Sequence, residues 1–119
     1  MQEIQVSDFE RTTDGQMVHL YRITNASGAS VVLCDYGASV VSILVPDKQQ
    51  NLRDVVLGYA HLSGYETGGE YFGASVGRCC NRIREGAFTL NGVSYQLAVN
   101  DGTNHLHGGN RSFSRRLWN

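Results

Sequence analysis

Proline and lysine are scarce in this sequence of 119 residues, which contains one proline, Pro46, and one lysine, Lys48. No apolar run approaches the ~20 residues that a membrane-spanning helix needs, and residues 1–5 lack the basic and apolar regions of a secretory signal peptide. The net charge of −1 argues against a protein built around nucleic acid. We therefore expect a cytoplasmic protein with no nucleic-acid and no membrane partner.

Cysteine is also too sparse for a disulfide framework. The three cysteines are an odd number, and two of them, Cys79 and Cys80, are adjacent, whereas Cys34 stands alone. The Cys-x-x-Cys spacing of a structural zinc site is absent as well. We expect reduced thiols and no metal.

Glycine is abundant, with 14 residues spread along the chain, and the pattern between the glycines favours strands. Residues rich in β-branched and aromatic side chains predict strands at 17–24, 30–34 and 39–45, and a short buried strand at 54–58. A bend is expected at 36–38, and Pro46 ends the third strand because it lacks a backbone donor. No segment shows convincing helical periodicity, since Gly64 weakens the one candidate turn at 61–66.

A β-hairpin is the clearest local prediction. Asn91 and Gly92 tolerate the positive φ angles of a type I′ turn. A two-residue loop there pairs residue 90 with residue 93 and residue 88 with residue 95, which places four apolar side chains on one face. With strands at short spacing, the chain is predicted to be all-β, an antiparallel sandwich or part of one.

Two segments, 71–83 and 104–109, combine small residues with polar side chains that suit a polar ligand. On an extended segment His105 and His107 would project to the same face, so metal binding, a structural role and ligand binding all remain open. Asn81 and Arg82 fit either a structural bridge between strands or a site in which an amide and a guanidinium bind the vicinal hydroxyls of a sugar.

These segments resemble the aldose 1-epimerase (galactose mutarotase) family. The resemblance rests on residues 71–83, 86–88, 91–92 and 104–109, together with 36–38, 45–47 and 54–58 upstream, in the order and spacing of that family. It implies a β-sandwich of the galactose mutarotase type with a sugar site on a concave sheet. It also implies interconversion of the α and β anomers of free aldohexoses such as glucose and galactose, without a cofactor.

Carried over residue by residue, the resemblance makes Asn81, Arg82 and His107 substrate-binding, whereas His105 falls where the family needs no histidine. The histidine acid and glutamate base of the family lie further along its chains, so this chain is expected to carry no catalytic residue. The resemblance thus implies that residues 1–119 form one incomplete domain, the N-terminal part of a mutarotase-like sandwich. Alone, this domain is expected to be inactive and to self-associate through exposed sheet edges.

Two other functions remain open from the sequence. A non-catalytic carbohydrate-binding or regulatory module could keep Asn81, Arg82 and His107 without ever using an acid and a base. A plain structural β-domain could keep the same residues for packing alone. A test of whether this chain binds sugar distinguishes the carbohydrate-binding module from the structural domain.

Overall fold

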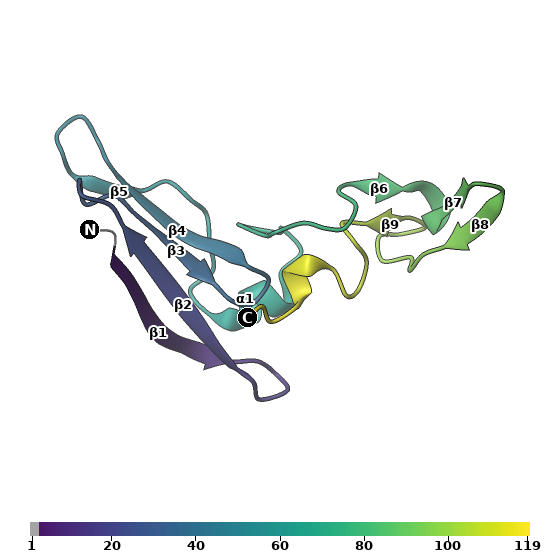
Figure 1. The fold of residues 1–119 in the computed structure, drawn as a ribbon, viewed down its shortest axis with the longest axis horizontal. Helices are drawn as coiled ribbons and strands as arrows, with labels where there is room; N and C mark the ends of the chain where they lie inside the picture. The colour runs from purple at the N-terminus through teal and green to yellow at the C-terminus, as the bar shows by residue number, and fades with distance from the viewer. Residues whose placement is uncertain (1–2) are drawn as a thin grey trace.

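The fold consists of a twisted sheet and an arm that extends from one end of it (Figure 1). The computed structural model describes residues 3–119. The arm makes the molecule elongated, with principal extents of 56, 36 and 26 Å. Both parts are built mainly from antiparallel strands, which confirms the all-β prediction.

The sheet has five antiparallel strands in the order β1-β2-β3-β4-β5, so that each strand pairs with the next one along the chain. These strands are β1 (Glu3–Arg11), β2 (Met17–Thr24), β3 (Ser30–Cys34), β4 (Ser39–Pro46) and β5 (Leu52–Asp54). The strands predicted at 17–24 and 30–34 are confirmed, and the one predicted at 39–45 extends one residue further. Strand β1 was not predicted.

The buried strand predicted at 54–58 is wrong. Strand β5 covers Leu52–Asp54 instead, and Val55 and Leu57 are 63% and 72% exposed. The Asp54 carboxylate explains the early end, because its Oδ1 accepts the backbone N–H of Val56 at 3.1 Å. This local hydrogen bond turns the chain immediately after the strand.

A short helix, α1 (Leu62–Thr67), packs beside the sheet and completes a small core. The core consists of Val18, Cys34, Leu62 and Tyr65, with partly buried neighbours such as Phe9 and Leu117. Gly64 does not prevent this helix. A Cβ at that position would lie 2.3 Å from Cγ of Tyr59, so glycine is what lets the tyrosine ring pack against the helix.

The arm contains two two-stranded ribbons. In the first, β6 (Arg82–Ile83) pairs with β9 (His105–Leu106), and in the second β7 (Ala87–Leu90) pairs with β8 (Val93–Gln96). The second ribbon confirms the predicted hairpin, since Phe88 faces Tyr95 and Leu90 faces Val93. The rings of Phe88 and Tyr95 stack with centroids 5.1 Å apart.

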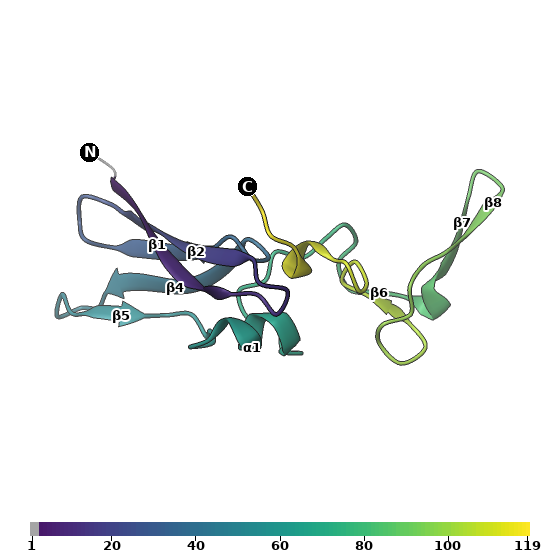
Figure 2. The ribbon, with the colours of Figure 1, turned by 90° about the horizontal axis from the view of Figure 1, so that it is seen from below.

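Two short 3-10 helices, η1 (Arg84–Gly86) and η2 (Phe113–Arg115), complete the secondary structure. After η2 the chain returns to the sheet, where Leu117 forms a bridge with Tyr36 and the Trp118 N–H donates to the Asp35 carbonyl at 2.9 Å. Figure 2 shows this C-terminal segment lying above the end of the sheet, at the base of the arm. The arm is therefore attached to the sheet at both of its ends.

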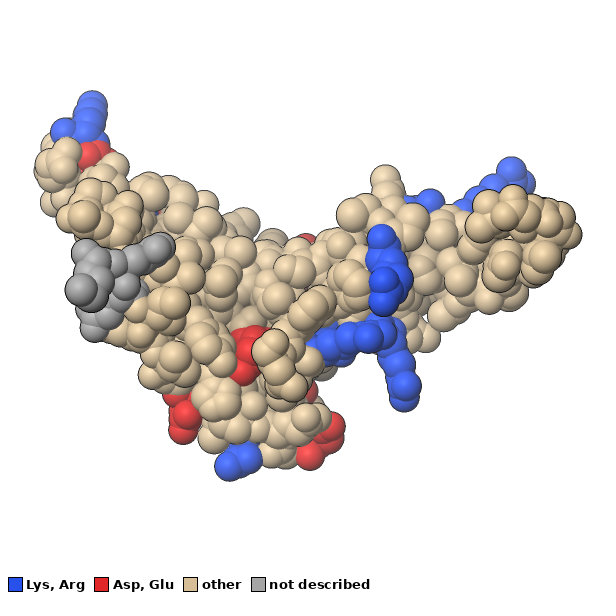
Figure 3. Space-filling model, viewed as in Figure 1, with Lys and Arg blue, Asp and Glu red and all other residues tan. Residues whose placement is uncertain are grey.

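Charge is distributed unevenly over these parts. Figure 3 shows basic side chains gathered where the arm leaves the sheet, whereas acidic side chains lie mainly over the sheet. Within residues 3–119, no helix is long and apolar enough to cross a membrane.

Candidate functional site

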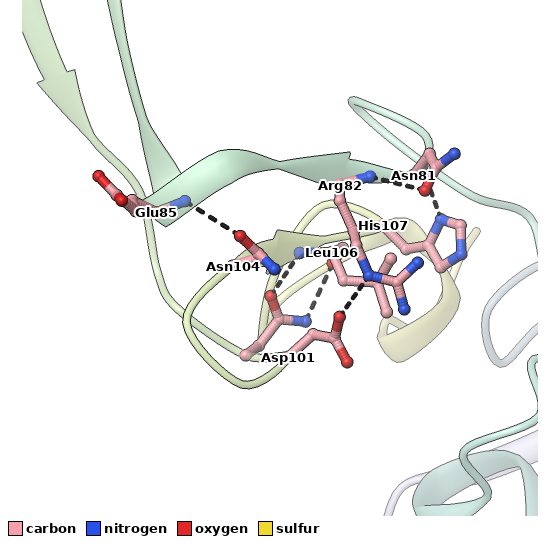
Figure 4. Close-up of polar contacts among 8 residues, drawn as sticks. Asn81, Arg82, Glu85, Asp101, Asn104, Leu106 and His107 are labelled. Atoms are coloured by element: carbon pink, nitrogen blue, oxygen red, sulfur yellow. Dashed lines mark hydrogen bonds and ion pairs between the residues drawn. The ribbon is translucent and has the colours of Figure 1, made fainter.

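The ribbon of β6 and β9 brings the two polar segments of the sequence together. Arg82 pairs with Leu106 and Ile83 pairs with His105 in an antiparallel register. Asn81 and His107 continue from the two strands at the same end of the ribbon (Figure 4). The three residues predicted to bind substrate, Asn81, Arg82 and His107, are thus neighbours in space.

Asn81 and His107 are joined by two hydrogen bonds. The Asn81 N–H donates to Nδ1 of His107 at 3.0 Å, and the His107 N–H donates to the Asn81 carbonyl oxygen at 3.2 Å. Because Nδ1 accepts, the proton of the neutral imidazole is on Nε2. His107 therefore presents a hydrogen-bond donor on the side of its ring away from Asn81.

Both of these residues have left-handed backbone geometry, with φ of 60° at Asn81 and 51° at His107. Asparagine adopts this conformation more readily than most residues. Its side chain supports the turn further, because Oδ1 of Asn81 accepts the N–H of Arg82 at 2.9 Å. The conformation holds the Asn81 N–H toward the imidazole.

Arg82 is oriented by an acidic residue that the sequence analysis did not identify. Nε of Arg82 lies 2.6 Å from Oδ2 of Asp101, and the two side chains are 55% and 35% exposed. Within residues 3–119 the two terminal guanidinium nitrogens have no hydrogen-bond partner. The ion pair thus holds the guanidinium in place and leaves its outer donors available for a ligand.

A tight turn holds Asp101 at this position. Its N–H donates to the Asn104 carbonyl at 3.0 Å, and the Asn104 N–H donates back to the Asp101 carbonyl at 2.8 Å. The amide of Asn100 then bonds both backbone groups of Leu106 in β9, at 2.8 and 2.9 Å. The Asn100 side chain thereby satisfies the backbone groups of Leu106 that would otherwise bond to a strand beside β9.

The two histidines have different roles in the structure. His105 is 5% exposed, and its Nδ1 lies 2.8 Å from the Ala98 carbonyl oxygen, which is a structural contact inside the arm. The His107 ring instead contacts the ring of Tyr71, with centroids 4.8 Å apart. The expectation that both rings share a face assumed an extended segment, and that condition is not met, because the strand ends at Leu106 and His107 adopts a positive φ.

Glycines bring the two segments into backbone contact. A Cβ on Gly108, whose φ is +92°, would lie 1.8 Å from the carbonyl oxygen of Gly77. The same oxygen accepts the N–H of Phe113 at 3.3 Å. No other residue fits at position 108, so this glycine determines how closely the segments around Arg82 and His107 approach.

The side chains gathered at this site are hydrogen-bond donors and acceptors. Among the described residues 3–119, no three His, Cys, Asp or Glu side chains are grouped so that they could hold a metal ion. Cys34, Cys79 and Cys80 are free thiols, and only Cys34 is buried. Burial raises the pKa of the Cys34 thiol to about 11, so this cysteine is a packing residue.

Known proteins are similar to this chain in sequence. A sequence model of the family described as aldose 1-epimerase matches residues 19–119. The galactose mutarotase of Sus scrofa is 48% identical over 88 residues, which cover 74% of this chain and 26% of that protein. The aldose 1-epimerase of Escherichia coli (strain K12) is 36% identical over 105 residues, 88% of this chain and 30% of that protein.

Solved structures share the fold. The galactose 1-epimerase of Lactobacillus acidophilus superposes with a TM-score of 0.83 at 24% identity, over 100% of this chain and 34% of the other. The GalM/aldose epimerase homologue of C. elegans superposes with a TM-score of 0.74 at 25% identity, over 98% of this chain and 32% of the other. The chain thus spans about a quarter to a third of the proteins it matches. A family match over most of the chain and a shared fold together show that this chain belongs to the aldose 1-epimerase family.

Proposed function

We propose that this chain supplies the sugar-binding residues of an aldose 1-epimerase that interconverts the α and β anomers of free aldohexoses such as glucose and galactose. The supporting observation is the convergence of Asn81, Arg82 and His107 at one end of the β6–β9 ribbon. Family membership favours this function over a non-catalytic carbohydrate-binding module.

The donors of this site suit the hydroxyl groups of a sugar. The two outer guanidinium nitrogens of Arg82 form a planar fork, which matches a pair of vicinal oxygens. Nε2 of His107 is a single donor that is fixed in direction by the Asn81 N–H. In this proposal Arg82 and His107 bind the sugar, and Asn81 contributes through its exposed amide.

Anomer exchange needs an acid and a base as well as a binding site. A base removes the proton of the anomeric hydroxyl while an acid protonates the ring oxygen, and the ring opens, rotates at the aldehyde carbon and recloses. We assign neither of these roles to a residue of this chain. The proposed contribution of residues 81, 82 and 107 is to hold the sugar while the proton transfers occur. The free thiols are compatible with a cytoplasmic location, which stays a prediction.

Sugar titration followed by NMR tests the binding proposal. Adding D-galactose to the ¹⁵N-labelled chain is expected to shift the amide signals of Asn81, Arg82 and His107 in a saturable way. Arg82→Ala should abolish these shifts, whereas Arg111→Ala, an exposed arginine outside the site, should leave them unchanged. Equal shifts in both variants, or no saturable shift in the original chain, contradict the proposal.

Polarimetry on freshly dissolved α-D-glucose tests the catalytic part. The chain alone is expected to leave the rate of mutarotation at that of buffer, because the site described here binds and does not transfer protons. An acceleration that disappears in Arg82→Ala would show that the proton-transfer groups are within this chain.

A further inference from the structure

Two exposed thiols lie directly beside the candidate sugar site. Cys79 and Cys80 are adjacent in sequence and both exposed, and they immediately precede Asn81. Neither thiol takes part in the core or in the contacts proposed for the sugar. A pair of neighbouring, accessible thiols is a bidentate ligand for soft, thiophilic elements, which prefer sulfur to oxygen and nitrogen.

Direct pairing of these thiols as a disulfide is unfavourable. Consecutive Cα atoms are about 3.8 Å apart across a trans peptide, whereas disulfides usually join Cα atoms about 4.4–6.8 Å apart. A third atom bound to both sulfurs closes a larger ring and removes that restriction. Trivalent arsenic forms two bonds to sulfur with a small angle between them, so it suits adjacent cysteines better than an ion that prefers opposed ligands.

We propose that Cys79 and Cys80 form a dithiol site that captures one trivalent arsenical, and that its occupation disturbs the contact between Asn81 and His107. In the capture step an arsenic(III) oxide, R–As=O, reacts with the two thiols. Two As–S bonds form, two S–H bonds and the arsenic–oxygen bond break, and the two protons leave with the oxygen as water. Arsenic stays trivalent, so no oxidant or reductant is needed.

The peptide group between Cys80 and Asn81 provides the coupling. Its carbonyl oxygen lies 3.6 Å from Sγ of Cys79, and its N–H donates to Nδ1 of His107 at 3.0 Å. One rigid planar unit therefore contacts a thiol at one side and the histidine at the other. We expect that binding both sulfurs to one arsenic atom breaks the contact of Cys79 Sγ with that carbonyl and turns the peptide, which weakens the hydrogen bond to His107.

Intact-mass spectrometry of the native chain with phenylarsine oxide tests the capture. One phenylarsenic group per chain is expected, resistant to excess 2-mercaptoethanol and removed by the dithiol 2,3-dimercaptopropanol. Cys79→Ser and Cys80→Ser each keep one exposed thiol, and both should lose the adduct to 2-mercaptoethanol. An adduct that survives the monothiol in either variant, or is lost to it in the original chain, overturns the proposal.

Amide hydrogen exchange tests the coupling without any sugar. In the arsenical adduct the Asn81 amide should exchange about fivefold faster, the factor that loss of one ordinary hydrogen bond implies. The Glu85 amide, which donates to Oδ1 of Asn104 at 3.1 Å in the same arm, is the matched control and should be unchanged. Equal exchange at Asn81 with and without arsenic overturns the coupling. Because neither readout involves sugar, these results are independent of the function proposed above.

Discussion

Arg82 and Asp101 form the ion pair that orients the candidate sugar site, with Nε of the arginine 2.6 Å from Oδ2 of the aspartate. The contact uses the inner nitrogen of the guanidinium and leaves the outer pair exposed. In the sugar site proposed above, Asp101 is therefore a positioning residue, which holds Arg82 and does not itself contact the sugar.

Replacing Asp101 should separate positioning from stability. Asp101→Asn is expected to weaken D-galactose binding about tenfold, or about 1.4 kcal/mol, because the guanidinium is no longer held in one direction. The free energy of unfolding should change by less than about 1 kcal/mol, since partly exposed ion pairs contribute little. NMR titration and urea denaturation measure the two effects. Glu85 is the control residue, because its carboxylate is 3.7 Å from Nε of Arg84 and its side chain is 69% exposed. Glu85→Gln should change neither galactose binding nor the free energy of unfolding.

The two histidines should respond in opposite ways to the same substitution. His105→Asn removes a buried ring and its bond to the Ala98 carbonyl, so the free energy of unfolding should fall by about 1–3 kcal/mol. His107→Asn keeps a residue that tolerates positive φ, so stability should be retained while galactose binding is lost. Thermal unfolding and sugar titration of both variants decide the assignment. A large loss of stability in His107→Asn with unchanged binding would reverse the two roles.

Gly108 should be intolerant of any side chain. Gly108→Ala places a Cβ 1.8 Å from the Gly77 carbonyl oxygen, at a φ of +92°, so the two segments must separate. The expected loss in the free energy of unfolding is about 3 kcal/mol or more. Gly69→Ala is the matched control, because a Cβ there meets nothing within 4 Å. Similar denaturation midpoints for the two variants would contradict the close approach.

Asp54 should contribute to the acid sensitivity of the fold. Hydrogen bonds from Ser42 first, and then from the N–H groups of Val56 and Ile43, lower the pKa of Asp54 below its ordinary value of 3.8. A lowered pKa in the folded state means that the stabilisation is complete above pH 3.8 and is lost as the pH falls through the folded value. Urea denaturation of Asp54→Asn at pH 7 and at pH 2–3 should show a smaller decrease than the original chain.

Local patterns predicted much of the fold. The strands at 17–24 and 30–34 and the hairpin around Asn91 and Gly92 follow from β-branched residues and turn chemistry that act within a few positions. The alternation of Ile4 and Val6 with polar neighbours is the signal by which β1 could have been predicted. The helix α1 lacked such a signal, because Gly64 is explained only by the Tyr59 ring that packs on it.

The sequence predicted which residues form the candidate site but not how they are arranged, and their binding of a sugar stays a prediction. The family resemblance selected Asn81, Arg82 and His107, and the structure brings them together. Asp101 was not predicted, because its contact with Arg82, 19 positions away in sequence, depends on the turn that brings the two residues together. Contacts of this kind become visible only when the chain is folded.

The return of the C-terminal segment to the sheet has a consequence for the order of folding. Strands β1 to β5 each pair with their neighbour in sequence, so the sheet can assemble through short loops. The bridge between Tyr36 and Leu117 instead joins positions about eighty residues apart, and its loop-closure entropy must be overcome before the contact stabilises anything. The sheet should therefore form first, and the junction that anchors both ends of the arm should close last.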